Sequence, residues 1–446
     1  MSRDHQSSRR SFLKQAALGA FAAPVFIRNV RAASPNDVVR HASFGASGMA
    51  FADLSAIITH PQVKLTCVAE VDLQRAEKLK QTFPELRVYQ DWRQMLDVEE
   101  GKLDSVNVST PDHMHASMAM ASMERGLHVY GQKPLTHDVY DSRRLAEYAG
   151  KKNLVTQMGI QIHSHPAYRS AVQLIQEGAI GKVTSVHSWS SKKWGDDTER
   201  PDRSDPVPDS LNWDQWQGVC ETRPFIGGGY YHPGSWRRRL DFGTGTFGDM
   251  GCHIFDPVFK ALELTAPLTL KSTGPAPNAH NWANNAVVHL TFPQTKHTTG
   301  PVVPITWYDG DERPGDEITS RWLKKRPLPE QGSLFIGEKG ALLLPHVEMP
   351  ILLPEETYKD YARPKLEDIN HWHQFIDAVR GKGKTSAHFG YAGPLTESVL
   401  LGGVATFFPQ ETLEWDAASL QFKNRPEAAI RLRKPPRKGW EVKGLS

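Results

Sequence analysis

Apolar residues in the first third of the chain predict an alternation of short buried strands and helices. Short stretches rich in Val, Leu and Ala at Val38–Phe44, Val63–Val71 and Leu103–Ser109 fit strands of a sheet. Further strands are expected at 88–89 and 127–130, and helices at 51–59, 73–83, 92–97 and 114–125. Strands and helices that alternate at this spacing are typical of a doubly wound parallel sheet.

The pattern changes after residue 157, and we place a domain boundary there. Residues 34–157 form the first domain, and residues 158–446 form a second α/β domain that binds substrate. In the second part we expect strands at 155–161, 183–190, 286–292, 302–308, 332–336 and 341–344, and helices at 168–177, 250–264, 368–380 and 391–406. Residues 191–242 are rich in Pro, Gly, Asp, Trp and Arg, and a loop that long is usually functional or mobile.

The first 33 residues predict an export signal. Arg9 and Arg10 are followed by Phe-Leu-Lys, by the apolar run 16–27, and by small residues near Ala33. The run is shorter than the roughly 20 residues that a bilayer span needs. The paired arginines are typical of the twin-arginine pathway, which predicts a periplasmic protein with no stable membrane span after cleavage. An uncleaved membrane anchor is the alternative.

The charge of the chain excludes a polycationic nucleic-acid binder. The formal net charge is +3, but six Lys/Arg and one Asp lie in residues 1–33. The remaining chain carries a small net negative charge, so we expect no nucleic acid as partner. The three cysteines lack metal-ligand spacing and form no disulfide framework, and no metal site is predicted.

A glycine-containing turn follows the first strand and predicts a dinucleotide site. Gly45, Ser47 and Ala50 stand at the three positions of the G-x-G-x-x-G pattern. Gly48, beside Ser47 and before Met49, supplies the room that the second glycine normally gives. An ordinary turn is the alternative, because the pattern counts only in the context of a strand before it and a helix after it.

An acidic residue about 20 positions further on completes this context. Glu70 ends the second strand, where a carboxylate binds the ribose hydroxyls of NAD and repels the 2′-phosphate of NADP. Asp72 is the second candidate. Arg75 argues in the opposite direction, so NADP stays as the alternative cofactor.

A lysine stands at the end of the strand at 127–130. In Gly131-Gln132-Lys133-Pro134, the proline restricts the residue before it and holds Lys133 in a defined turn. The carboxyl ends of parallel strands are where open α/β sheets bind ligands. A solvated turn lysine is the alternative.

Three stretches of the sequence resemble one family. They are Ser109-Thr110-Pro111-Asp112-His113-Met114-His115, Gly131-Gln132-Lys133-Pro134-Leu135 and the run from Gly245-Thr246-Phe247-Gly248-Asp249 to Asp256. In this order they resemble the glucose–fructose oxidoreductase and inositol dehydrogenase family (Gfo/Idh/MocA), and with the export signal its secreted branch. The resemblance implies a Rossmann domain followed by an α+β domain with a large, open, mainly antiparallel sheet that closes over the nicotinamide.

The resemblance also implies roles for single residues. Lys133 matches the lysine near nicotinamide ribose and substrate, and Asp249 with His253 matches the D-x-x-x-H pair. The sequence departs from the family at Gln132, where glutamate is usual. Further cofactor candidates are Ser109, Thr110, Pro111, His115 and Gln132, and substrate candidates are Gln161, His163, Tyr231, His232, Trp236 and Arg237.

Asp249 and His253 suit proton transfer. Residues four apart on a helix lie on one face, and a histidine titrates near neutrality, as a base for a hydroxyl proton requires. A carboxylate beside it orients the ring and stabilises its charged form. The alternative is that Asp249 is an N-cap and His253 a packed core residue.

Three functions are compatible with these features. The first is an NAD(P)-dependent oxidoreductase that acts on a hydroxyl of a sugar, polyol or glycoside. The second is a glycoside hydrolase or lyase in which tightly bound NAD is reduced and reoxidised within one cycle. The third is a non-catalytic secreted protein. In each case we expect a homo-oligomer, because open sheets such as that of the second domain tend to be covered.

Overall fold

The computed structural model describes residues 38–446 except residue 325. The expected export signal at 1–33 therefore lies outside the described residues. Within the described ranges, no helix combines the length and the apolar character that a membrane crossing requires.

The first sheet is parallel throughout and has the strand order β3-β2-β1-β4-β5-β6. From β1 the chain adds β2 and β3 on one side and then β4, β5 and β6 on the other, so the strand order switches between β1 and β4. In such folds ligands bind beside the carboxyl ends of the strands at this switch point. The doubly wound sheet predicted from the sequence is thus confirmed. Its strands are β1 (Val39–Phe44), β2 (Val63–Ala69), β3 (Arg87–Tyr89), β4 (Ser105–Val108), β5 (His128–Gly131) and β6 (Thr156–Met158).

Helices connect these strands, and one of them was not expected from the sequence. Helix α6 buries Val139, Leu145 and Ala149 on one face and ends where Asn153 adopts the left-handed conformation. The other residues of the helix are mostly polar. The apolar residues that face the core are therefore few and widely spaced, which explains why the sequence pattern did not predict the helix. The helices of this part are α2 (Met49–Ile57), α3 (Leu73–Thr82), α4 (Trp92–Val98), α5 (His115–Glu124) and α6 (Val139–Lys152).

The second sheet has nine strands in the order β13-β12-β11-β7-β10-β9-β8-β14-β15. Only the β7–β10 pair is parallel, which confirms a mainly antiparallel sheet. The strands are β7 (Val183–Ser190), β8 (Thr269–Ser272), β9 (Val287–Pro293), β10 (Val302–Asp309), β11 (Gln331–Gly337), β12 (Ala341–Pro345), β13 (Ile351–Leu353), β14 (Thr412–Asp416) and β15 (Gln421–Phe422). The helices of this part are α7 (Pro166–Gln176), α8 (Trp213–Gln217), α9 (Gly245–Leu262), α10 (Asp316–Leu323), α11 (His371–Val379) and α12 (Phe389–Ala405).

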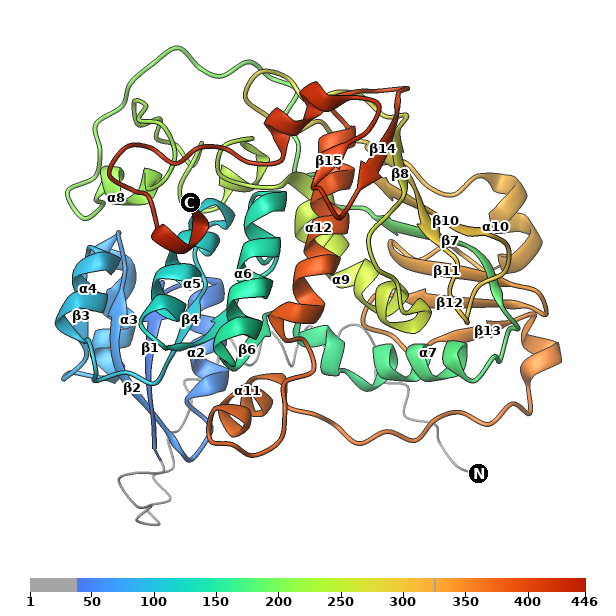
Figure 1. Cartoon of the computed structure of the whole chain (residues 1–446), viewed down its shortest axis with the longest axis horizontal. Coiled ribbons are helices and arrows are strands. Elements are labelled where there is room, and N and C mark those ends of the chain that lie inside the picture. Colours follow the sequence, from blue (N-terminus) through green and yellow to red (C-terminus); the bar gives the residue numbers. More distant parts are fainter. Residues whose placement is uncertain (1–37, 325) are drawn as a thin grey trace.

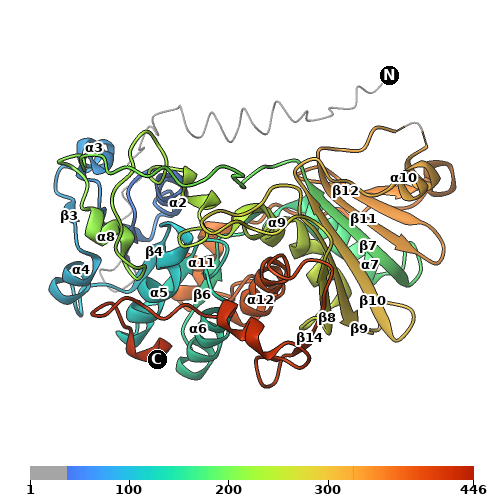
Figure 2. The same ribbon diagram turned by 90° about the horizontal axis from the view of Figure 1, so that it is seen from above.

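The two sheets lie at opposite ends of an elongated molecule, with α6, α12 and α9 between them (Figures 1 and 2). Helix α12 packs against α6 on one side and α9 on the other. The ring of Phe247 on α9 stacks on Trp307 of the second sheet, with ring centroids 4.7 Å apart. The core is therefore continuous from one domain to the other.

Helix α9 begins five residues earlier than the sequence suggested. We expected a loop at 243–249, but the helix starts at Gly245 and Asp249 lies inside it, so the N-cap interpretation of Asp249 is wrong. The glycines serve close packing instead of a loop. A Cβ on Gly245 would lie 2.8 Å from the Trp282 ring, and one on Gly251 would lie 2.6 Å from the Phe247 ring.

Candidate functional site

The glycine turn after β1 has the geometry of a dinucleotide-binding loop. Gly45 has φ +98°, and a Cβ there would lie 2.9 Å from both the Ser109 carbonyl oxygen and the Ala50 side chain. Helix α2 starts directly after Gly48, and no side chain caps its N-terminus. The first backbone N–H groups of α2 thus remain free of side-chain caps, as an anion such as a pyrophosphate requires.

Glu70 stands at the carboxyl end of β2, where the sequence placed the ribose acid. Its carboxylate accepts hydrogen bonds from the backbone N–H groups of Ala46 (3.0 Å) and Asp72 (3.1 Å). Burial raises the pKa of Glu70 above its ordinary value, although both hydrogen bonds oppose this shift. The two bonds connect the acid directly to the glycine turn.

One cavity joins this loop to the ends of β4 and β5. Most of the residues predicted to bind cofactor line it, and so do three substrate candidates from the segment 191–242. Trp92 also lines it, and its buried indole nitrogen has no hydrogen-bond partner among the described residues. The predicted residues that line it are Gly45, Ser47, Gly48, Met49, Glu70, Ser109, Thr110, Pro111, Gln132, Lys133, His232, Trp236 and Arg237.

At the end of this cavity, Lys133 contacts helix α9. Its Nζ lies 2.5 Å from Oδ1 of Asp249 and 3.0 Å from the Asp249 carbonyl oxygen. Arg237 approaches the same Oδ1 at 3.0 Å. Burial alone would raise the pKa of Asp249, but the charges of the two cations outweigh it and hold the pKa well below its usual range.

His253 lies one helical turn beyond Asp249. Its Nδ1 is buried and has no hydrogen-bond partner in the described part of the chain. Burial lowers the pKa of His253 well below its ordinary value, and the positive charge of Lys133 and the neighbouring His346 act in the same direction. The imidazole is therefore neutral at neutral pH, the form that accepts a proton.

Several predicted residues lie away from the cavity lining. His163 Nδ1 lies 2.8 Å from Asp256 Oδ1 in a separate pocket between α7 and α9. Tyr231 is buried in a cluster of aromatic rings. Gln161 is the first residue of the short 3-10 helix Gln161–Ser164 before α7. Its side-chain oxygen Oε1 is buried without a hydrogen-bond partner among the described residues.

His115 and Asp72 hold chain segments together. The ring nitrogens of His115 lie 2.7 Å from the Pro134 carbonyl oxygen and 2.8 Å from that of Thr110, so the ring joins the two loops from behind. Asp72 accepts a hydrogen bond from Ser210 Oγ at 2.7 Å and pairs with His232 at 3.0 Å. These contacts attach the segment 191–242 to the first domain.

The sequence analysis did not single out other residues of the site. Asp112 is buried 3.8 Å from Arg237 and accepts a hydrogen bond from Thr244. Asp112 lies within the stretch Ser109–His115 that resembles the family, so its neighbours Pro111 and His115 could have drawn attention to it. Trp216 lines the cavity from α8, and no local pattern predicts that contact.

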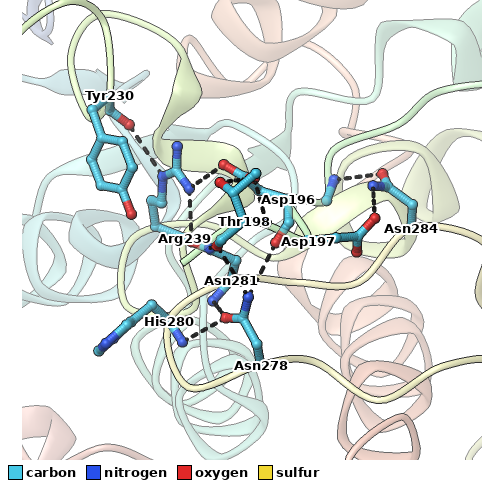
Figure 3. Close-up of polar contacts among 10 residues, drawn as sticks. Asp196, Asp197, Thr198, Tyr230, Arg239, Asn278, His280, Asn281 and Asn284 are labelled. Carbon is cyan, nitrogen blue, oxygen red and sulfur yellow. Dashed lines mark hydrogen bonds and ion pairs between the residues drawn. The ribbon is translucent and has the colours of Figure 1, made fainter. Parts of the chain in front are cut away.

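The segment that carries Arg237 is fixed by a polar cluster in the second domain (Figure 3). The guanidinium of Arg239 donates to Asp196 and to Asn281, each at 2.7 Å, and lies over the ring of Tyr230. Asn281 in turn donates to the Thr198 carbonyl oxygen at 2.9 Å. Arg237 is thus held two residues from a rigid anchor, which restricts where its own guanidinium can lie.

Comparison with known proteins identifies the family. A model of the Gfo/Idh/MocA oxidoreductase family, NAD-binding Rossmann fold, matches residues 39–160, and a model of the C-terminal alpha/beta domain of that family matches residues 175–296. The chain belongs to this family. Its first domain is therefore an NAD-binding domain.

Named relatives cover parts of the chain. The levoglucosan dehydrogenase of Pseudarthrobacter phenanthrenivorans is 25% identical over 189 residues, which are 42% of this chain and 40% of that protein. The scyllo-inositol 2-dehydrogenase (NAD(+)) of Bacillus subtilis is 28% identical over 145 residues, 32% of this chain and 42% of that protein. The chain thus spans less than half the length of these two curated relatives.

A solved structure matches almost the whole fold. The WlbA dehydrogenase from Bordetella pertussis, in complex with NADH and UDP-GlcNAcA, superposes with a TM-score of 0.59 at 15% identity. The match covers 85% of this chain and 99% of that one. At this identity the similarity establishes the fold alone.

Proposed function

We propose that this protein is an NAD-dependent oxidoreductase that acts on a hydroxyl group of a sugar, polyol or glycoside. The observation that carries the proposal is the contact of Lys133, at the end of the dinucleotide cavity, with the helix that bears Asp249 and His253. The named dehydrogenases of levoglucosan and scyllo-inositol support a carbohydrate or polyol as substrate.

The residues of the cavity fit NAD. The free N-terminus of α2 would hold the pyrophosphate, and Glu70 would accept from the adenosine ribose and repel a 2′-phosphate. When bound, the nicotinamide supplies the hydride acceptor or donor. His253 accepts the hydroxyl proton as a neutral imidazole, and Lys133 donates a hydrogen bond to the reacting oxygen. Asp249 fixes the lysine in its place.

The role of His253 is tested by His253→Ala in the full chain. Turnover should fall about 10²–10⁴-fold, because general base catalysis contributes this much, while the affinity for NADH stays unchanged. A screen of glycosides, aldoses and inositols that monitors NADH absorbance first identifies a substrate. His289→Ala, on the exposed part of β9, is the matched control and should retain full turnover. Turnover in His253→Ala equal to that of the parent protein would contradict the assignment.

A redox-neutral glycoside hydrolase or lyase is the second candidate, and one observation favours it. His232, Pro233 and Trp236 of the segment 191–242 line the cofactor cavity, and the segment is attached to the first domain through Asp72. A cofactor under such a cover is retained through many cycles. Release of free sugar without net formation of NADH would identify this activity, whereas stoichiometric NADH would eliminate it.

We also propose export by the twin-arginine pathway to the periplasm, on the strength of the arginine pair at the start of the sequence. The pathway fits a protein that folds around its cofactor before export. Arg9→Lys/Arg10→Lys should leave the protein in the cytoplasm of the host, and unchanged fractionation would refute this proposal.

The nine-stranded sheet is the proposed face for a homo-oligomer. Strands β9 and β10 expose His289 and Val302, the latter 38% exposed. An open sheet of this size is usually covered. Sedimentation equilibrium measures the assembly directly, and a monomer at micromolar concentration would count against it.

A further inference from the structure

A carboxylate lies buried behind the cofactor cavity. Asp53 stands in the second turn of α2, between Ala50 and Ile57 on the face that packs into the first domain, and its side chain is fully buried. A core-facing helix position is normally apolar, and a buried carboxylate persists only when hydrogen bonds compensate its lost hydration. The partners of Asp53 therefore indicate its role.

Three side chains from distant parts of the chain donate to this carboxylate. Ser109 Oγ at the end of β4 donates at 2.7 Å and Gln132 Nε2 after β5 at 2.8 Å, both to Oδ2. Trp372 Nε1 on α11 donates to Oδ1 at 2.9 Å. Ser109 Oγ itself accepts a hydrogen bond from Asn107 at 2.9 Å, so its own proton points to Asp53. An ionised carboxylate accepts all three donors, and a neutral amide cannot.

Two of the three donors line the cofactor cavity, but Asp53 does not. Ser109 precedes the Thr110–Pro111 loop, and Gln132 precedes Lys133. The carboxylate thus fixes the first residue of both loops from outside the cavity. We propose that Asp53 is a positioning residue for the cofactor loops and that it acts as a pair with Gln132. The inference rests on the proposed function only in that both assign the cofactor to this cavity.

The pair explains why position 132 carries an amide. The carbonyl oxygen of the Gln132 side chain accepts from the Lys133 backbone N–H at 3.3 Å, while its amide group donates to Asp53. Glutamate at 132 would place a second carboxylate against the first, and two such groups cannot both ionise without strong repulsion. Burial already raises the pKa of Asp53 to about 6 despite its three donors, so the pocket tolerates one negative charge and no more.

The geometry predicts that the charge can be exchanged between the two positions. In Asp53→Asn/Gln132→Glu the new amide at 53 donates to the new carboxylate at 132. Ser109 Oγ, whose proton pointed to Asp53, then faces an amide N–H and loses its acceptor. Each single variant instead brings together two groups of the same kind. Residues in direct contact show coupling of this type, whereas distant residues do not.

The experiment compares the two single variants with the double variant in the full chain. Backbone amide exchange of residues 109 and 110 in the first loop and of residues 132, 133 and 135 in the second is measured in the cofactor-free protein. The dissociation constant for NADH is measured by fluorescence titration. Each single variant should speed amide exchange in both loops and raise the dissociation constant about tenfold, which lies within the range of coupling between contacting residues. The double variant should return the exchange of the 132–135 loop to within about threefold of the parent protein, because the contact between positions 53 and 132 is restored, while residues 109 and 110 stay faster. Its dissociation constant for NADH should lie between those of the parent protein and the single variants. Asp104→Asn, which removes an exposed partner of Arg40 in the same domain, is the control and should change neither value.

A double variant no better than the weaker single variant would overturn the inference, as would a Gln132→Glu protein with unchanged loops. If the single variants fail to fold, a folded double variant with a protected 132–135 loop supports the pair. If all three fail, Trp372→Phe decides: faster exchange in both loops supports the role, and unchanged exchange refutes it. Amide exchange needs no cofactor or substrate, so a parent protein that turns over no carbohydrate contradicts the proposed function without affecting this outcome.

Discussion

At the scale of single residues, the site balances charges in a confined volume. Asp249 is buried between Lys133 and Arg237, and His253 lies one turn away with an unpartnered Nδ1. The carboxylate keeps Lys133 in place, and burial, together with the neighbouring cations, keeps the imidazole neutral. Each group thus stays in the protonation state that proton abstraction from a hydroxyl requires.

This balance makes the pH dependence of turnover predictable. The pKa of His253 lies well below its ordinary value, so the acid limb of kcat/KM should fall below pH 6.5. Replacing His346 by Asn removes one of the electrostatic interactions that lower this pKa, so the pKa of His253 should rise and the acid limb should move to higher pH. Profiles of kcat/KM against pH for the parent, His346→Asn and the exposed His289→Asn measure the shift. A limb that moves to lower pH, or that moves equally in the control, would contradict this account.

At the scale of elements, small residues allow α9 and α12 to pack closely, and this packing sets the position of the helix face that bears Asp249 and His253. Phe247 of α9 fits against Gly402 of α12, where a Cβ would lie only 2.1 Å from the ring. Phe247 also stacks on Trp307 of the sheet, so the ring has little room to move. Asp249 and His253 follow Phe247 on the same helix.

Gly402→Ala should destabilise the fold by about 1–3 kcal/mol, the usual cost of overpacking a core. The matched control is Gly150→Ala on the exposed face of α6, where nothing lies within 4 Å of the added Cβ. That change should stabilise the protein by about 0.5–1 kcal/mol, because alanine favours a helix interior. Urea denaturation of both variants measures the two free energies of unfolding. An unchanged free energy of unfolding in Gly402→Ala would show that the ring of Phe247 can shift to make room for the added Cβ. If Gly402→Ala is destabilising, adding Phe247→Leu should recover part of the lost stability.

The same elements show how far local sequence determines structure. Stretches rich in Val, Leu and Ala, such as Val63–Val71, predicted the parallel strands, because such residues favour buried strands. The start of α9 was misplaced because its glycines resemble a loop, although they serve contacts with Trp282 and Phe247. Asp53 went unrecognised for a related reason: its three donors come from β4, β5 and α11, and no local pattern brings them together.

At the scale of the whole molecule, the segment 191–242 connects the two domains across the cofactor cavity. On the first domain, Asp72 binds Ser210 and His232, and the backbone N–H of Asn212 donates to the Val71 carbonyl oxygen at 2.8 Å. On the second domain, Arg239 anchors the segment through Asn281 (Figure 3). His232, Pro233 and Trp236 of this segment line the cavity proposed for the dinucleotide, so we expect release of the cofactor to require the contacts on the first domain to break.

Asp72→Ala should therefore increase the dissociation rate of NADH more than it slows association. Loss of a partly buried hydrogen-bonded carboxylate costs about 1–3 kcal/mol, which corresponds to a factor of about ten or more in rate when the cost falls on release. Asp209→Ala, one residue before Ser210 on the exposed side of the segment, is the control and should leave the rate unchanged. Stopped-flow displacement of NADH by excess NAD measures both variants. Equal release rates in the two would mean that the cofactor leaves by a route that the segment does not cover, and the redox-neutral mechanism would then lose its structural support.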